Sequence, residues 1–338
     1  MMIKDAINHF VAGKSLTRRE AYLVMDEILS GKATEAQISA FLVALQLKGG
    51  TVDEIAGSVD AYRERVTPLS IDDENAIDTS GTGGDDLGTF NISTVAAFIA
   101  AGAGAKVVKH GYRSISSQCG SADVLQKLGI QTELFPDQFY RVFRTTGLAF
   151  IFAPRYKPTF RHFAGIRRSL GVRTLINILD PLTKPALTKR HLIGVYDYQL
   201  SRLIAEVLRE FGMFQAMVVS GENGLDELNI CGKTHVVELS GNDIIEYDLM
   251  PEDVGLKTWP VEALQGGDAD TNQQILISIL DGEAGAPRDV SIYNAAAALR
   301  MAGVAADIKE GVALAAESID SGAAKHKLQD MITISRTL

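Results

Sequence analysis

The segment from Asp78 to Asp85, with the sequence DTSGTGGD, contains the residues whose types and spacing are best suited to chemistry. Its glycines at 81, 83 and 84 allow the backbone to turn sharply and to approach a ligand closely. The segment leads into Asn91 and a run of small residues that predicts a helix, and backbone N–H groups beside a helix N-terminus bind anions. Because Asp78 and Asp85 would repel a bare phosphate, the segment predicts a phosphorylated sugar bound together with a divalent metal.

A second group of polar residues follows the next β-prone segment. Lys109 offers an ammonium group to a phosphate, and Arg113 offers a planar guanidinium. The serines at 116, 117 and 121 can donate hydrogen bonds to phosphate oxygens, and Asp123 is expected to cap the following helix. An ordinary polar loop that ends in a helix cap has a similar composition, but the position directly after Lys109 and His110 favours a phosphate site.

Asp226 and Glu227 form the third candidate site. Adjacent carboxylates on a loop repel each other unless a cation lies between them. Mg²⁺ is usually bound by one or two carboxylates together with substrate phosphate oxygens, and this pair fits that pattern. A solvated acidic turn or the N-terminus of a helix is the alternative that the residues leave open.

Three capping boxes near the start of the chain predict an all-helical unit. Threonines at 17, 34 and 51 each precede a Glu or Gln by three residues and open an amphipathic run. Together with residues 4–11, these runs predict a small helical domain over residues 1–67. A basic segment at about 158–190 is expected to pack against it as a non-contiguous part.

The rest of the chain predicts an α/β domain over residues 68–157 and 191–338, with a central and mainly parallel sheet. The β-prone segments are 76–78, 106–109, 148–152, 215–219 and 235–239. Ligands bind at the carboxyl ends of such strands, so the loops at 79–85, 109–118 and 220–227 are expected to converge. Thr271 is expected to cap a helix near the C-terminus.

Composition and charge narrow the class of protein. The chain has 338 residues, of which 46% are apolar and 22% charged, as in an ordinary globular protein. Its net charge of −9 argues against nucleic-acid binding. Residues 106–190 nevertheless hold 15 Lys and Arg against 4 acidic residues. This net +11 indicates either a field focused on a polyanionic small ligand or a few solvated helix faces.

The sequence also carries expectations about location. Its two cysteines are too few for a disulfide framework, and the N-terminus has no apolar signal-peptide region. The longest uncharged run, residues 95–105, is too short to span a bilayer. We therefore expect a cytoplasmic protein that binds neither membranes nor nucleic acid.

Taken in order, these segments resemble the anthranilate phosphoribosyltransferase family of tryptophan biosynthesis. The matching segments are Gly81 to Asp85, Phe90 to Thr94, Lys109 to Gly111, Arg113, Ser116 and Ser117, Gly120 to Asp123, Phe152 to Pro154, Leu170 to Thr174, Asn177, Pro181 and Leu182, Gly224 to Glu227, Gly266 to Asp268, and Asn294 to Ala296. The resemblance covers nearly the whole chain. The nucleoside phosphorylases of the same fold are the alternative family, but their diagnostic glycine-loop sequence is not present.

The resemblance implies a small all-helical domain joined to a large α/β domain, in a homodimer formed through the small domains. It also implies transfer of a phosphoribosyl group from 5-phosphoribosyl 1-pyrophosphate to the amine of anthranilate, with Mg²⁺ bound by Ser93, Asp226 and Glu227. No general base is assigned. The residues implied for the donor are Gly81, Thr82, Gly83, Gly84, Asp85, Thr89, Asn91, Ser93, Thr94, Lys109, Arg113, Ser117 and Ser121.

The acceptor side departs from the family pattern. The residues implied there are His110, Tyr112, Lys157, Arg167, Asp180 and Pro181. Arg167 matches the arginine that faces the acceptor carboxylate, but Tyr112 stands where the family usually has Asn. Lys157 likewise replaces a usual His, and Asp180 a usual Gly. Three alternatives for the acceptor follow. It is anthranilate, or it is a related aromatic amine, or the protein is a non-catalytic relative that binds a sugar phosphate and has no acceptor.

Overall fold

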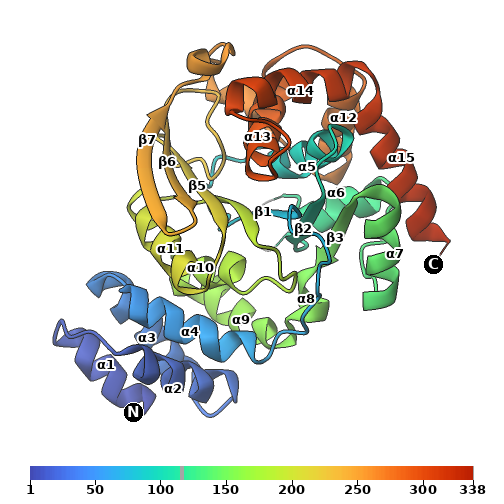
Figure 1. The fold of residues 1–338 in the computed structure, drawn as a ribbon. Coiled ribbons are helices and arrows are strands. Elements are labelled where there is room, and N and C mark those ends of the chain that lie inside the picture. Colours follow the sequence, from blue (N-terminus) through green and yellow to red (C-terminus); the bar gives the residue numbers. More distant parts are fainter. Residues whose placement is uncertain (115–117, 338) are drawn as a thin grey trace.

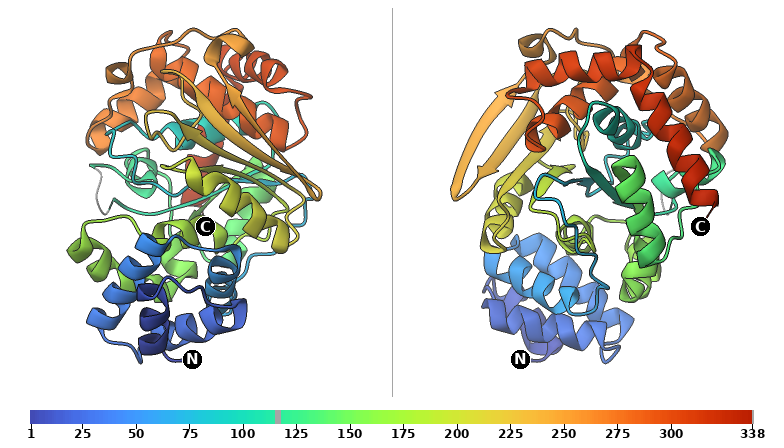
Figure 2. Two further views of the ribbon diagram at one scale, coloured as in Figure 1. Left: turned by 90° about the vertical axis from the view of Figure 1, so that its left-hand side faces the viewer. Right: turned by 45° about the vertical axis from the view of Figure 1, so that its right-hand side comes forward.

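The computed structural model describes residues 1–114 and 118–337, and it begins with a unit of four helices. These are α1 (Ile3–Val11), α2 (Arg18–Leu29), α3 (Glu35–Lys48) and α4 (Val52–Arg63). The three predicted capping boxes are confirmed, because the side chains of Thr17, Thr34 and Thr51 each accept a hydrogen bond from the amide three residues later. Figures 1 and 2 show this unit as a separate layer at one end of the molecule.

A single seven-stranded sheet lies at the centre of the larger part of the molecule, in the order β3-β2-β1-β4-β5-β6-β7. The strands are β1 (Ile77–Gly81), β2 (Val107–Gly111), β3 (Leu148–Phe152), β4 (Arg190–Gly194), β5 (Gln215–Gly221), β6 (Thr234–Ser240) and β7 (Asp243–Leu249). The first five strands in this order pair in parallel, and β6 and β7 add to the edge in antiparallel pairing. The predicted α/β class with a mainly parallel central sheet is confirmed.

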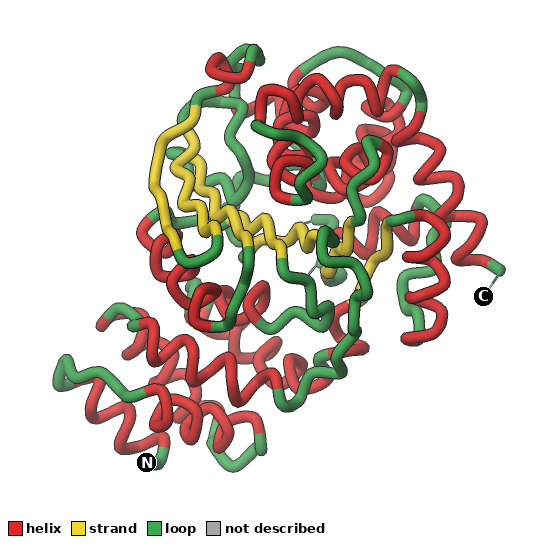
Figure 3. Tube along the Cα trace, viewed as in Figure 1, coloured by secondary structure: helices red, strands yellow, loops and turns green. Residues whose placement is uncertain are grey.

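Helices cover both faces of the sheet (Figures 1 and 3). On one face lie α5 (Ile92–Gly102), α12 (Ala269–Leu280), α13 (Ala286–Met301), α14 (Ile308–Asp320) and α15 (Ala323–Arg336), with α6 (Ser121–Lys127) and α7 (Pro136–Thr146) beside them. On the face turned towards the small unit lie α10 (Leu175–Leu182) and α11 (Gln199–Glu210). Within the described residues, no helix has both the length and the apolar character needed to cross a membrane.

The segment around residues 158–190 shares a hydrophobic core with the N-terminal helices. After the short α8 (Ala153–Tyr156) it forms α9 (Arg161–Leu170) and α10. Phe163 of α9 and Leu179 of α10 are fully buried in the same cluster as Phe41 of α3. Ile193 of β4 belongs to this cluster as well, so the small unit, α9, α10 and one face of the sheet pack as one continuous core.

Three local expectations need correction. β4 and β7 were not expected as strands, and β1 continues to Gly81, into the segment expected to be loop. The N-cap of α12 is Asp268, whose carboxylate accepts a hydrogen bond from the amide of Thr271, so Thr271 is not the cap. Asp123 is not the N-cap of α6 either. It is the third residue of that helix, and its carboxylate accepts hydrogen bonds from the amides of Gly120 and Ser114.

Candidate active site

A cavity of about 320 Å³ lies where the parallel strands end, and it brings together most of the residues singled out in the sequence. Its lining is Ser80, Gly81, Thr82, Gly83, Gly84, Asp85, Thr89, Phe90, Asn91, Ile92, Ser93, Thr94, Lys109, His110, Gly111, Tyr112, Arg113, Ser114, Cys119, Gly120, Ser121, Arg167, Asn177, Asp180, Asp226 and Glu227. Among the expected site residues, Lys157 and Pro181 are not in this lining, and Ser117 lies outside the described residues. A second cavity of about 320 Å³ adjoins the first and shares Gly84, Asp85, Thr89 and Cys119 with it.

The glycine loop lies directly against the Asp226 segment. Gly83 and Gly84 have φ values of +62° and +83°, which side chains rarely adopt. The amide of Gly83 donates a hydrogen bond of 2.8 Å to Asp226 Oδ2. A Cβ atom on Gly81 would lie 2.7 Å from the same oxygen, so glycine is required there by the close approach of the carboxylate.

Asp226 and Glu227 are half-buried carboxylates, and Glu227 lies against the N-terminus of α5. Glu227 Oε1 accepts a hydrogen bond of 3.1 Å from the amide of Ser93, and Lys109 Nζ donates 2.9 Å to Ser93 Oγ. Burial, followed by repulsion from Asp85, raises the pKa of Asp226 to about 7. Burial, followed by repulsion from Asp226, raises the pKa of Glu227 to about 8. The pair is therefore not a solvated acidic turn, and its negative charge is only partly offset by Lys109.

Gly194, at the end of β4, is a site-positioning residue that the sequence reasoning missed. A Cβ atom there would lie 1.5 Å from the backbone oxygen of Asp226. Its only signal in the sequence is a glycine that closes a short apolar run, Leu192 and Ile193. Asn177, which also lines the cavity, was noticed only as part of a matching segment.

Gly194→Ala should therefore push the Asp226 backbone away from the cavity. We expect the free energy of unfolding to fall by about 1–3 kcal/mol, as for other overpacked sites, together with a weaker apparent Mg²⁺ affinity. Gly165→Ala is the matched control, because its Cβ would meet nothing within 4 Å. Denaturant unfolding and Mg²⁺ titration of both variants measure the effect, and equal behaviour of the two would contradict it.

The three acceptor-side departures form one contact cluster. Lys157 Nζ donates hydrogen bonds to Asp180 Oδ1 (2.7 Å) and to the backbone oxygen of Asp180 (2.8 Å), and the Tyr112 hydroxyl donates to Asp180 Oδ1. Burial alone would raise the pKa of Asp180, but the Lys157 ammonium and the hydrogen bonds outweigh it and hold that pKa below its usual value. Lys157 itself is 0% exposed, so it lies behind Asp180 and not on the cavity wall.

Asp78, expected beside the ligand, is instead completely buried beneath the glycine loop. Its Oδ2 accepts a hydrogen bond of 3.2 Å from His110 Nδ1, and its Oδ1 lies 3.5 Å from His191 Nε2. His191 Nε2 is also within 2.9 Å of Ser80 Oγ. Because a carboxylate only accepts hydrogen bonds, Asp78 fixes the proton of His110 on Nδ1 and orients the ring.

The basic residues between 106 and 190 divide between the cavity and the surface. Lys109, Arg113 and Arg167 line the cavity. Arg113 is half exposed and forms an ion pair of 3.1 Å with Glu133 at the rim. Other members of the set, such as Lys189, lie on the surface. Some of the basic residues therefore face the cavity, where they could act on a ligand, and others are solvated surface residues.

Comparisons with known proteins agree with this geometry. The model of the glycosyl transferase family helical bundle domain matches residues 4–66, and the model of that family's a/b domain matches residues 73–325. Anthranilate phosphoribosyltransferase from Anaeromyxobacter sp. (strain Fw109-5) is 48% identical over 99% of both chains, and that from Moorella thermoacetica is 48% identical over 98% of both.

Two solved structures have the same fold. Anthranilate phosphoribosyltransferase from Thermus thermophilus superposes with a TM-score of 0.91 at 39% identity, covering 98% of this chain and 99% of that one. The enzyme from Saccharomyces cerevisiae in complex with PRPP and Mg superposes with a TM-score of 0.88 at 25% identity, covering 99% of this chain and 98% of that one. The resemblance seen in the sequence is confirmed: the chain is a glycosyltransferase that belongs to the anthranilate phosphoribosyltransferase family.

Proposed function

We propose that this protein transfers the phosphoribosyl group of 5-phosphoribosyl 1-pyrophosphate to the amino group of anthranilate, releasing pyrophosphate, in a Mg²⁺-dependent step of tryptophan biosynthesis. The observation that carries the proposal is the cavity lined jointly by the glycine loop, Lys109 and the Asp226–Glu227 pair. The family to which the chain belongs supports it.

The residues present suit a hard divalent cation. Asp226 and Glu227 are adjacent carboxylates whose pKa values are raised by burial and then by repulsion from neighbouring acids, and Ser93 adds a hydroxyl oxygen from the start of α5. Mg²⁺ held by these oxygens would supply positive charge to the leaving pyrophosphate. Lys109, buried within β2, is a cation of the protein itself that lines the same cavity.

The chain's own residues would act mainly by positioning. The glycines of the loop line the cavity with backbone rather than side chains, so the leaving group could approach it closely where negative charge collects. As the bond from the ribose C1 to the pyrophosphate oxygen weakens, C1 becomes oxocarbenium-like, and the acceptor nitrogen attacks from the opposite side. An aromatic amine needs little activation, so orientation in one cavity can supply much of the rate.

A second candidate is the same transfer to a different aromatic amine. The cluster of Tyr112, Asp180 and Lys157 favours it, because all three residues depart from the family pattern and they contact one another. Such a linked set would change the shape and hydrogen bonding of the acceptor side as a unit.

One assay tests both candidates. The purified protein is mixed with 5-phosphoribosyl 1-pyrophosphate, Mg²⁺ and anthranilate, and both the anthranilate fluorescence and the release of pyrophosphate are followed. Loss of fluorescence with stoichiometric pyrophosphate supports anthranilate as the acceptor. If the donor binds but the fluorescence does not change, anthranilate is excluded as the acceptor. Substituted aminobenzoates and other aromatic amines are then assayed for pyrophosphate release.

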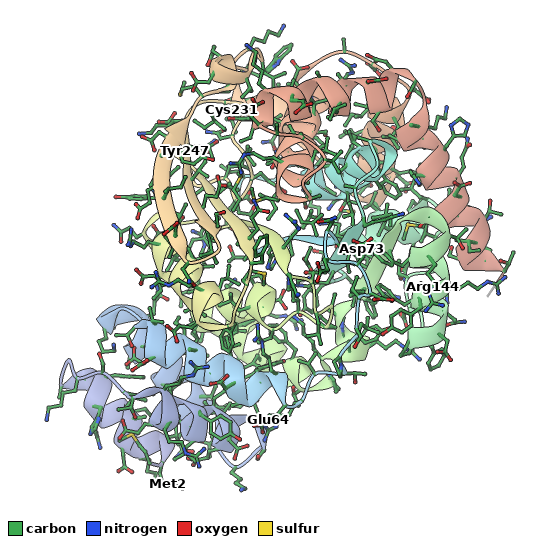
Figure 4. The ribbon with its side chains drawn as sticks, viewed as in Figure 1. Met2, Glu64, Asp73, Arg144, Cys231 and Tyr247 are labelled. Carbon is green, nitrogen blue, oxygen red and sulfur yellow. The ribbon has the colours of Figure 1, made fainter. Side chains whose placement is uncertain are left out.

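We also propose a homodimer formed through the small helical unit. Apolar side chains on that unit are strongly exposed, with Met2 at 60%, Val11 at 78% and Leu47 at 83%. In Figure 4, Met2 lies at the outer edge of the small unit, away from the large domain. Sedimentation velocity tests this, and a species with the mass of one chain would remove the proposal. A cytoplasmic setting stays a prediction from the sequence.

A further inference from the structure

Asp180 presents a carboxylate whose two oxygens have different surroundings. Oδ1 accepts hydrogen bonds from Lys157 Nζ and from the Tyr112 hydroxyl, and the same ammonium also binds the backbone oxygen of Asp180. These contacts hold the side chain in one orientation. Lys157 is 0% exposed, so its role in the folded protein is to anchor Asp180 and not to contact a ligand.

The other oxygen, Oδ2, is available to a ligand. In the part of the chain that the structure describes, nothing donates a hydrogen bond to it. His110 Nε2 lies 3.9 Å away, beyond hydrogen-bonding distance. The Asp180 side chain is 15% exposed and lines the cavity, so Oδ2 offers lone pairs to an occupant of the acceptor side.

Arg167 provides the complementary group. It lines the same cavity, and among residues 1–114 and 118–337 it forms no ion pair. Tyr112 and Asp180 line the same cavity as Arg167. Since Lys157 cancels the charge of Asp180, Arg167 leaves this end of the cavity with a net positive charge. A ligand with one carboxylate and one N–H group would satisfy both residues.

We propose that Asp180 Oδ2 accepts a hydrogen bond from the amino group of the acceptor and takes its proton as the C–N bond forms. The inference rests on the proposed function. The nitrogen lone pair forms the bond to C1, the C1–O bond breaks, and its electron pair leaves with pyrophosphate. The nitrogen becomes positively charged and its proton acidic, so the proton passes to Oδ2 and then to water. Lys157 and Tyr112 are positioning residues.

The chemistry explains why the anchor matters. A carboxylate that could rotate would lose rate by misplacing the proton acceptor by a fraction of an ångström. Fixing Oδ1 by two donors leaves Oδ2 in one place, and the hydrogen bond it accepts helps to turn the amine lone pair towards C1. It also selects acceptors, because an acid without an N–H or O–H donor would leave Oδ2 unpaired.

Binding measurements test the proposal without turnover. Anthranilate and benzoate are titrated calorimetrically into the protein with Mg²⁺ and pyrophosphate present, since benzoate keeps the ring and carboxylate and lacks the amine. We expect the wild type to bind anthranilate about 10-fold more tightly, and this preference to fall to about 2-fold or less in Asp180→Asn/Lys157→Gln. Asp281→Asn/Lys325→Gln, the same pair of changes at a surface ion pair outside the cavity lining, is the matched control and should retain the wild-type preference.

Kinetics give a second readout. In the double variant, kcat should fall about 100-fold while KM for 5-phosphoribosyl 1-pyrophosphate is unchanged, because the donor residues are untouched. Asp180→Asn, which keeps the number and arrangement of heavy atoms, is measured in parallel. Circular dichroism shows which of the two variants folds, and the kinetics of a folded variant decide whether Asp180 acts in the reaction.

The outcomes separate this inference from the proposed function. An anthranilate preference that survives loss of Asp180, or a wild type without any preference, overturns the inference even if anthranilate is turned over. An Asp180-dependent preference in a protein that does not turn anthranilate over supports the inference and removes only the assignment of anthranilate as substrate.

Discussion

Asp226→Asn combined with Glu227→Gln should lower kcat/KM at least about 1,000-fold while the protein stays folded. Removing a single electrostatic contact to a transition state commonly costs about 100- to 1,000-fold, and this change removes two carboxylates together. Lys109 would remain as a buried cation beside Ser93, with Asp78 but without the other two acids, Asp226 and Glu227, that now act on it. The variant should still fold, because the amides preserve the shapes of the side chains, and the Gly83 and Ser93 amides keep an oxygen to bind.

The matched control is a second adjacent acidic pair, Asp73→Asn with Glu74→Gln. Glu74 is exposed, and its carboxylate forms a surface ion pair with Lys189; Asp73 (labelled in Figure 4) accepts a local hydrogen bond from the amide of Asn75. Initial rates of pyrophosphate release across a Mg²⁺ series compare the two pairs. Equal rates for the two double variants would remove the metal-binding role of Asp226 and Glu227.

Asp226 and Glu227 should also make the free energy of unfolding depend on pH in a defined direction. The pKa values of Asp226 and Glu227 are raised to about 7 and about 8, so between their unfolded values near 4 and these folded values the folded protein binds more protons. Without Mg²⁺, wild-type stability relative to Asp226→Asn/Glu227→Gln should therefore fall from about pH 4 to pH 8 and then level off. Apparent Mg²⁺ affinity should rise over the same range, because binding releases these protons.

Local chemistry explains why the helical unit, and the meeting of the glycine loop and Lys109 in one cavity, could be predicted. Each capping box spans four consecutive residues, so a short stretch of sequence is enough to predict where α2, α3 and α4 begin. The glycine loop begins at the end of β1 and Lys109 lies within β2, and parallel strands bring their carboxyl ends to one edge of the sheet. Residues far apart in sequence thus reach one cavity through topology alone.

Long-range contacts explain what could not be predicted. β4 begins with Arg190 and His191, whose polar character conceals a strand, and His191 is accommodated only because Asp78 and Ser80 on β1 face it. Asp180 meets Lys157 and Tyr112 from 23 and 68 positions away, and no periodicity relates such residues. The sequence therefore indicated an altered acceptor side, but not that its altered residues bind one another.

Asp78→Asn should lower the free energy of unfolding by about 3–5 kcal/mol at pH 7, the usual cost of removing one partner from a buried charged cluster. Asp78 is 0% exposed and lies between His110 and His191. Burial lowers the pKa of Lys184 to about 8 even though Asp78 acts to raise it, so the variant would leave this ammonium buried without its opposite charge. Asp72→Asn, an exposed change just before β1, is the control and should cost less than about 0.5 kcal/mol.

The stability contributed by Asp78 depends on pH with the opposite sign to that contributed by Asp226 and Glu227. Burial opposes ionisation of Asp78, but His110 and its hydrogen bond outweigh it and hold the pKa of Asp78 well below its usual value. A lowered folded pKa stabilises the protein above the unfolded pKa near 4, and this stabilisation is lost as pH falls. Urea unfolding measures the difference in free energy of unfolding between the wild type and Asp78→Asn. This gap should have its full size at pH 7 and be smaller below about pH 4. A gap that is small at pH 7, or that widens in acid, would show that Asp78 does not hold this cluster together by its charge.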